Sequence, residues 1–186
     1  MNSVEPIRDK KKIEAMKKIL YAQDIRDFVL FVLGINSGIR ISDLRMLRDT
    51  DVKNNTGKLK ERIVIKEIKT GKVKNYPVND AAKKALLEYL GYEKPNGKYL
   101  FVSRKGKGPI SRVQAYRILN YAAELIGIDR IGTHSLRKTF GYHAYKAGYS
   151  LDLLQYLFNH SSGKVTLRYI GITQDQIDEV YINVNL

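Results

Sequence analysis

Two Ile- and Val-rich runs separated by a Thr-Gly turn constrain the fold of this chain more than any other feature. They extend from Arg62 to Lys69 and from Lys72 to Val78, and Thr70-Gly71 lies between them. β-Branched residues bounded by turn residues are typical of a β-hairpin. We therefore predict β structure over residues 48–78, with the hairpin at its end.

Helical periodicity dominates the remaining sequence. Apolar residues recur at intervals of three and four, and polar N-cap residues such as Ser42, Asn79 or Asp80, and Ser111 precede several of these segments. The stripe expected to face inward after Ser111 is Val113, Tyr116, Leu119, Ala123 and Ile126. The expected helices span residues 8–22, 24–35, 43–47, 80–90, 112–126, 134–146, 150–158, 163–169 and 173–180, with a short strand at 99–103. The fold class predicted is mainly α with a small antiparallel β-sheet (α+β).

Charge and composition narrow the function. Lys and Arg number 33 against 19 acidic residues, for a net charge of +14, which favours a polyanionic partner such as nucleic acid. No cysteine is present, so thiolate metal sites and a cysteine nucleophile are excluded. The three histidines form no H-E-x-x-H motif, and we expect neither a metal nor a cofactor. A signal peptide and an apolar span are both lacking, which predicts a cytoplasmic, nucleoid-associated protein without a membrane partner.

Four short motifs could carry chemistry, and each is weak alone. Arg40 lies at a turn beside a helix start, and Asp43 could orient its guanidinium, which fits two phosphate oxygens. A surface ion pair would leave the same pattern. Lys69 lies at the hairpin turn, where its ammonium could protonate a leaving alkoxide, although a turn lysine is usually only solvated.

The other two motifs lie in the second half of the chain. His134 and Arg137 are three residues apart, so they share one helix face and could address one phosphate. His160 is followed by Tyr169, but the chain has 13 tyrosines, and a lone tyrosine is more often a packing residue. Leu153, Leu154, Tyr156 and Leu157 are expected in the core.

The order of these motifs resembles the catalytic domain of the tyrosine recombinases (phage-integrase family) over roughly residues 10–175. The resemblance rests on Ser37-Gly38-Ile39-Arg40-Ile41-Ser42-Asp43-Leu44, hairpin Lys69, His134-Ser135-Leu136-Arg137, Phe158-Asn159-His160-Ser161-Ser162, and Tyr169 nine residues after His160. Phe158 and Asn159 replace the usual Leu and Gly, and Gly171 stands where many members have His. Asn tolerates a left-handed backbone better than most residues, so the turn can survive.

The resemblance implies metal-free cleavage and rejoining of DNA through a 3′-phosphotyrosyl bond to Tyr169. Arg40, Arg137 and His160 would stabilise the phosphorane-like transition state, with His134 as the candidate base and Lys69 as the candidate acid. Asp43 is a supporting residue. Tyr156 and Tyr181 are the alternative nucleophiles. For contact with double-stranded DNA the candidates are Lys72, Arg104, Lys105, Lys107, Arg112 and Arg117.

Alternatives of other classes remain open at this point. They are a DNA-binding regulator without catalysis, a type IB topoisomerase-like enzyme that relaxes DNA supercoils, and a ribosomal or RNA-binding protein. Only the net charge supports the last of these. The six intact catalytic positions argue against the first, and the ordered motifs argue against the last.

We expect residues 1–186 to form a single catalytic domain, with a core at roughly 10–175, a C-terminal tail at 173–186 and no N-terminal core-binding domain. The resemblance implies self-association on DNA as dimers, and as tetramers at synapsis. The apolar residues Ile177, Val180, Tyr181 and Ile182 could carry that contact by docking on a neighbour. Packing of the tail on its own domain, with a monomer in isolation, fits the sequence equally well.

Overall fold

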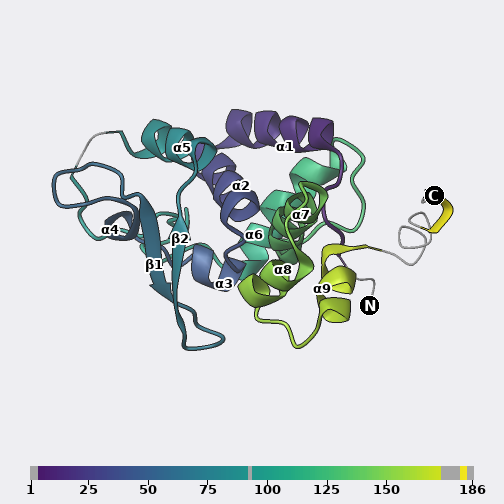
Figure 1. The fold of residues 1–186 in the computed structure, drawn as a ribbon. Coiled ribbons are helices and arrows are strands. Elements are labelled where there is room, and N and C mark those ends of the chain that lie inside the picture. The colour runs from purple at the N-terminus through teal and green to yellow at the C-terminus, as the bar shows by residue number, and fades with distance from the viewer. Residues whose placement is uncertain (1–3, 92–93, 173–180, 184–186) are drawn as a thin grey trace.

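Helices pack beside one two-stranded antiparallel sheet in the computed structural model, which describes residues 4–91, 94–172 and 181–183 (Figure 1). In chain order the elements are α1 (Lys10–Gln23), α2 (Ile25–Ser37), α3 (Ile41–Leu44), α4 (Asp49–Val52), β1 (Arg62–Lys66), β2 (Val73–Pro77), α5 (Asp80–Leu90), α6 (Arg112–Glu124), α7 (Thr133–Lys146), α8 (Leu151–Phe158) and α9 (Gly163–Ile170). The predicted fold class is confirmed. The helix expected at 173–180 lies outside the described residues.

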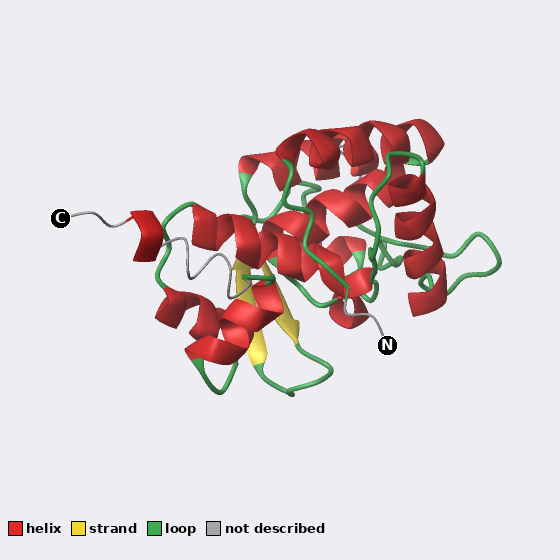
Figure 2. Cartoon of the chain, turned by 90° about the vertical axis from the view of Figure 1, so that its right-hand side faces the viewer, coloured by secondary structure: helices red, strands yellow, loops and turns green. Residues whose placement is uncertain are grey.

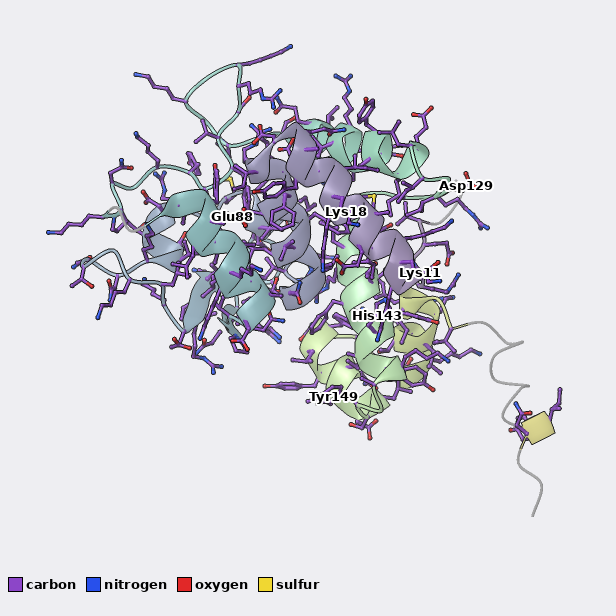
Figure 3. All side chains as sticks on the ribbon, turned by 90° about the horizontal axis from the view of Figure 1, so that it is seen from above. Lys11, Lys18, Glu88, Asp129, His143 and Tyr149 are labelled. Atoms are coloured by element: carbon purple, nitrogen blue, oxygen red, sulfur yellow. The ribbon has the colours of Figure 1, made fainter. Side chains whose placement is uncertain are left out.

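The hairpin forms where the sequence predicts it. β1 and β2 pair in the register Arg62 with Pro77 through Lys66 with Val73, and Figure 2 shows the two strands alongside the helices. Residues 67–72, named here the Lys69 turn, connect them. The turn lies at the lower end of the hairpin in Figure 1, whereas α1 and α5 cover the upper side. Figure 3 views that upper side, with Lys11 and Lys18 on α1 and Glu88 on α5.

Two of the β predictions were wrong, the first part of residues 48–78 and the separate strand at 99–103. Residues 49–52 form helix α4, because the Asp51 carboxylate accepts a hydrogen bond of 2.7 Å from the Arg48 amide and stabilises a helical start. Residues 99–103 form isolated bridges in place of a strand, with Tyr99 opposite Arg48 and Val102 opposite Pro109. Proline has no amide N–H, so the second bridge cannot extend into a ladder.

Three details of the helix prediction also needed correction. Helix α3 begins at Ile41 with Arg40 at the N-cap position, two residues earlier than a cap at Ser42 implies. In α6, Val113 and Tyr116 are exposed, whereas Ala115, Leu119, Ala122 and Ala123 are buried. The large apolar side chains predicted an inward face that includes Val113 and Tyr116. Close packing of α6 instead buries the face that carries its small alanines. The Ser111 and Asn79 caps are confirmed.

Helix α8 exposes most of the face that was expected in the core. Leu154 and Phe158 are buried, but Tyr156 is 76% exposed, and Leu153 and Leu157 are also exposed. Residues four apart share a helix face, so one narrow stripe is enough to attach this short helix.

Two hydrophobic clusters set the position of the C-terminal helices. The larger cluster surrounds α2, and the smaller one joins α7, α8 and α9 through Tyr142, Leu154, Phe158, Ile170 and Ile172. Gly141 lies at the centre of the smaller cluster, because a Cβ there would be 2.6 Å from Phe158 and 2.7 Å from Ile170. The absent side chain at Gly141 therefore lets α8 and α9 pack closely on α7. Within the described residues, helices are all too short or too polar to cross a membrane.

We predict that Gly141→Ala destabilises the chain by about 2 kcal/mol, since overpacking costs up to about 3 kcal/mol and alanine returns about 1 kcal/mol of helix propensity. Urea unfolding followed by circular dichroism measures the change. Gly106→Ala is the matched control, because nothing lies within 4 Å of an added Cβ there. Equal stabilities of Gly141→Ala and the parent chain would contradict this account of the helix packing.

Candidate active site

Arg40 reaches the site from the break between α2 and α3. Gly38 ends α2 with a left-handed backbone (φ 64°), and a Cβ there would lie 2.6 Å from Phe140. The next residue, Ile39, is buried, and Arg40 then directs its guanidinium toward the hairpin. Its Nη1 lies 2.5 Å from Oε1 of Glu67, whose side chain is 1% exposed.

Glu67 was missed by the sequence analysis, although a signal for it existed. Ile63, Ile65 and Glu67 alternate along β1 and its extension, so they point to the same, inward face of the hairpin. A carboxylate at an inward position, surrounded in sequence by lysines, indicates a buried charge partner. Burial raises the pKa of Glu67, but the hydrogen bond from Thr70 and the charge of Arg40 outweigh it, and the net pKa is lowered.

Asp43 occupies a different place from the one expected. Its Oδ1 accepts a hydrogen bond of 2.8 Å from the Ile68 amide, so it holds the Lys69 turn, while Arg40 pairs with Glu67. Burial raises the pKa of Asp43, and the nearby Glu67 charge adds to that effect. Within the part of the chain that the structure describes, Asp43 Oδ2 is a buried oxygen without a hydrogen-bond partner.

Lys69 is exposed at the turn, and its charge reaches both site histidines. His134 lies in the first turn of α7. Partial burial lowers its pKa most, and the positive charges of Arg112, Lys138, Lys69 and Arg137 lower it further. The pKa of His160 is also lowered, first by burial and then by Arg137, Arg40 and Lys69. The structure therefore brings Lys69 and both histidines into one electrostatic neighbourhood.

Arg137 is buried on α7 and connects the two halves of the site. Its Nη1 donates a hydrogen bond to the Gly38 carbonyl, and its guanidinium carbon lies 4.7 Å from the centre of the Phe158 ring. Burial lowers the pKa of Arg137, whereas Tyr169 acts in the opposite direction. The guanidinium also donates a hydrogen bond to Tyr169, and its remaining N–H groups can face a phosphate.

His160 and Tyr169 meet across the turn between α8 and α9. Asn159 ends α8 with a left-handed backbone (φ 56°), so the turn expected at this position forms with Asn in place of Gly. The two rings are 4.9 Å apart and nearly perpendicular. His160 Nδ1 is 3.1 Å from the hydroxyl of Thr166, a buried residue that the sequence analysis also missed.

The Tyr169 phenol lies beside the two arginines. Burial raises the pKa of Tyr169, while the charges of Arg137 and Arg40 and a hydrogen bond from Arg137 lower it, and burial prevails. Lys138 Nζ lies 5.5 Å from the centre of the Tyr169 ring. Helix α9 packs on α7 of the same chain, and charge interactions link the six predicted catalytic residues within one copy.

The six predicted DNA-contacting residues are divided over the surface. Lys72 donates a hydrogen bond of 3.0 Å to Asn159, and Arg104 pairs with Asp24 at 2.7 Å. Lys105 and Lys107 are exposed on the loop before α6, and Arg112 and Arg117 are exposed on α6. Arg112 lies close enough to His134 to lower its pKa, and Lys72 contacts the residue before His160, so these two lie beside the site.

Known sequences resemble this chain over most of its length. A model of the phage integrase family matches residues 8–176. The probable integrase/recombinase YoeC of Bacillus subtilis (strain 168) is 44% identical over 97% of each chain. The tyrosine recombinase XerC of Staphylococcus saprophyticus is 30% identical over 87% of this chain and 54% of its own length. The chain thus spans nearly all of YoeC but about half of XerC.

Solved structures share the fold at low sequence identity. The crystal structure of XerA recombinase gives a TM-score of 0.75 at 19% identity, covering 100% of this chain and 66% of that one. A lambda integrase (75–356) dimer bound to a COC′ core site gives 0.67 at 19% identity, covering 94% of this chain and 63% of that one. These likenesses support the fold.

We predict that both site histidines titrate below 6.5 in the DNA-free chain, because burial and neighbouring cations disfavour the imidazolium form. The unfolded chain, with histidine pKa values of about 6.5, binds more protons, so the free energy of unfolding decreases as pH falls from about 6.5 through the lowered folded-state pKa values. Two-dimensional NMR of the imidazole resonances measures the pKa values, with the urea-unfolded chain as control. Folded-state values at or above the control would contradict the described electrostatics.

Proposed function

This chain belongs to the phage integrase family and carries a tyrosine recombinase catalytic domain, and we propose that it cuts and rejoins double-stranded DNA through Tyr169. The observation that carries the proposal is the packing of the Tyr169 ring on His160, with its phenol beside Arg137 and Arg40. A tyrosine surrounded by phosphate-binding groups is suited to attack a phosphodiester.

In the proposed reaction the Tyr169 oxygen attacks the phosphorus atom. A tyrosyl O–P bond forms, the bond from phosphorus to the 5′ oxygen breaks, and a 3′-phosphotyrosyl intermediate results. His134 accepts the phenolic proton, and Lys69 gives a proton to the departing 5′ oxygen. Religation is the reverse, so the phosphodiester energy is conserved in the protein–DNA bond.

Cations in the site would stabilise the charge that develops on the nonbridging oxygens. Arg40 and Arg137 each present a planar fork of N–H donors, and His160 adds another donor when protonated. The exposed lysines of the 103–109 loop and the arginines of α6 would contact the DNA backbone. DNA as substrate is also consistent with the recombinases that have been solved on DNA.

We predict that Tyr169→Phe abolishes the covalent adduct but keeps DNA affinity within about twofold, because only the attacking oxygen is lost. Adduct formation is measured with a nicked suicide substrate, which traps the adduct after strand loss. DNA affinity is measured by a mobility-shift assay. Tyr156→Phe is the control, since Tyr156 is 76% exposed on α8. An adduct that persists in Tyr169→Phe would move the nucleophile to another tyrosine.

Self-association on DNA is the second part of the proposal. Helix α8 presents Leu153, Tyr156 and Leu157 to solvent, and this apolar face is suited to receive the C-terminal segment of a second copy. Within that segment Tyr181 and Ile182 are 80% and 76% exposed. The lambda integrase structure, a dimer on its core site, is consistent with such an arrangement.

We predict that Leu153→Ser with Tyr156→Ser lowers the share of DNA-bound dimer at least several-fold, since apolar burial at the contact is lost. Sedimentation velocity with a duplex carrying two inverted core half-sites measures the stoichiometry. Tyr121→Ser, at a 54% exposed position on α6, is the matched control. Unchanged dimerisation of the double variant would exclude the α8 face.

A further inference from the structure

A buried carboxylate lies directly beneath the catalytic cations, in a position outside the family-like motifs. Glu67 Oε1 accepts hydrogen bonds from Arg40 Nη1 at 2.5 Å and from the Tyr76 hydroxyl at 3.0 Å, and Oε2 accepts one from the Thr70 hydroxyl at 2.7 Å. Its backbone closes the same turn, because Glu67 N donates to the Lys72 carbonyl and Gly71 N donates to the Glu67 carbonyl.

We propose that Glu67 is a positioning residue that holds the Arg40 guanidinium and the Lys69 turn in one fixed relation. The inference rests on the proposed strand-cleavage function, for which Arg40 and Lys69 have separate roles. Arg40 would bind the nonbridging oxygens of the phosphate, while Lys69 would protonate the 5′ oxygen. Glu67 contacts the Arg40 guanidinium directly, and it also contacts Thr70 in the turn that carries Lys69.

The energetics favour positioning over a purely stabilising role. A buried carboxylate loses its hydration, and a buried ion pair contributes little net stability because this desolvation cost offsets the attraction. Such a pair instead orients the arginine side chain. Glu67 holds the Arg40 guanidinium through Nη1, while the N–H groups of Nε and Nη2 remain available to a ligand. Tyr76 acts as a donor throughout the neutral range, because burial and Glu67 raise its pKa to about 12.

The turn needs such an anchor because Lys69 has none of its own in the described contacts. Its side chain is exposed, and a lysine stem has four rotatable carbons. Two carboxylates fix the backbone beneath it, Asp43 through the Ile68 amide and Glu67 through the Thr70 hydroxyl. A shift of the turn by about 1 Å is enough to slow a proton transfer by up to about a hundredfold.

The test compares Glu67→Gln with the parent chain in single-turnover cleavage at saturating DNA. Glutamine keeps the size and an acceptor oxygen but removes the charge. Each protein is given a suicide substrate with an ordinary phosphodiester and one with a 5′-bridging sulfur, whose thiolate leaves without a proton donor. Lys69→Ala lacks the proposed proton donor and is the reference for rescue by sulfur. Arg40→Ala keeps that donor and is the reference for failure of rescue.

We expect Glu67→Gln to cleave the phosphodiester about tenfold to a hundredfold more slowly, with DNA affinity within about twofold. The sulfur substrate should recover at least fivefold of that loss, because displacement of Lys69 no longer matters. Glu61→Gln is the matched control and should cleave like the parent, since Glu61 is an exposed partner of Lys83. If Glu67→Gln does not fold, Thr70→Val, which keeps the charge, should show the same preference for sulfur in smaller measure.

Equal losses on both substrates, or no loss on either, would overturn the inference and leave Glu67 a structural residue. Hydrogen exchange of the Gly71 amide in the DNA-free chain provides a separate readout. We expect Glu67→Gln to accelerate it at least fivefold, and unchanged exchange would overturn the inference without reference to cleavage. A parent chain that forms no adduct would instead refute the proposed function.

Discussion

The repulsion between closely placed cations is the constraint on which the geometry of this site depends. Arg40, Arg137 and Lys69 lie near one another in a chain of net charge +14, and negative charge within the protein offsets part of their repulsion in the DNA-free chain. The buried carboxylates of Glu67 and Asp43 supply that charge from beneath. Because both are bonded to the hairpin, the same contacts that neutralise the cations also determine where the hairpin lies.

Helix packing gives the site its other half. Arg137 of α7 donates a hydrogen bond to the carbonyl of Gly38. This one side chain therefore joins the break after α2 to α7, the helix on which α8 and α9 pack. Gly141 then lets α8 and α9 approach α7. The N-terminal segment adds a further tie, since Arg8 donates to the Gly171 carbonyl at the end of α9 at 2.8 Å. The helix that carries Tyr169 is therefore held by α7 and by the segment before α1.

The sequence was informative where function depends on backbone punctuation and on the order of motifs. Gly38, the Thr70-Gly71 turn and the Asn159 turn lie where predicted, because each marks a local backbone requirement that the residue type reveals. The partner of Arg40 was assigned to Asp43 because that residue is close in sequence. Pairing with Glu67 depends on how the hairpin folds back on α3, and no local pattern encodes that distance. The exposed face of α8 was misjudged for the same reason, since apolar residues indicate a core only when another element covers them.

The electrostatic state of His160 indicates how substrate would complete the site. The Thr166 hydroxyl donates to the Ser162 carbonyl at 3.2 Å, so in its 3.1 Å contact with His160 the Nδ1 atom is the donor. A neutral ring then carries no proton on Nε2 and cannot donate to a phosphate oxygen. Burial, and then the surrounding cations, lower the pKa of His160 and favour that neutral state, but a bound phosphate would counter the charge of the cations and raise the pKa. Entry of DNA would thus favour the protonated form of His160, in which both ring nitrogens can donate.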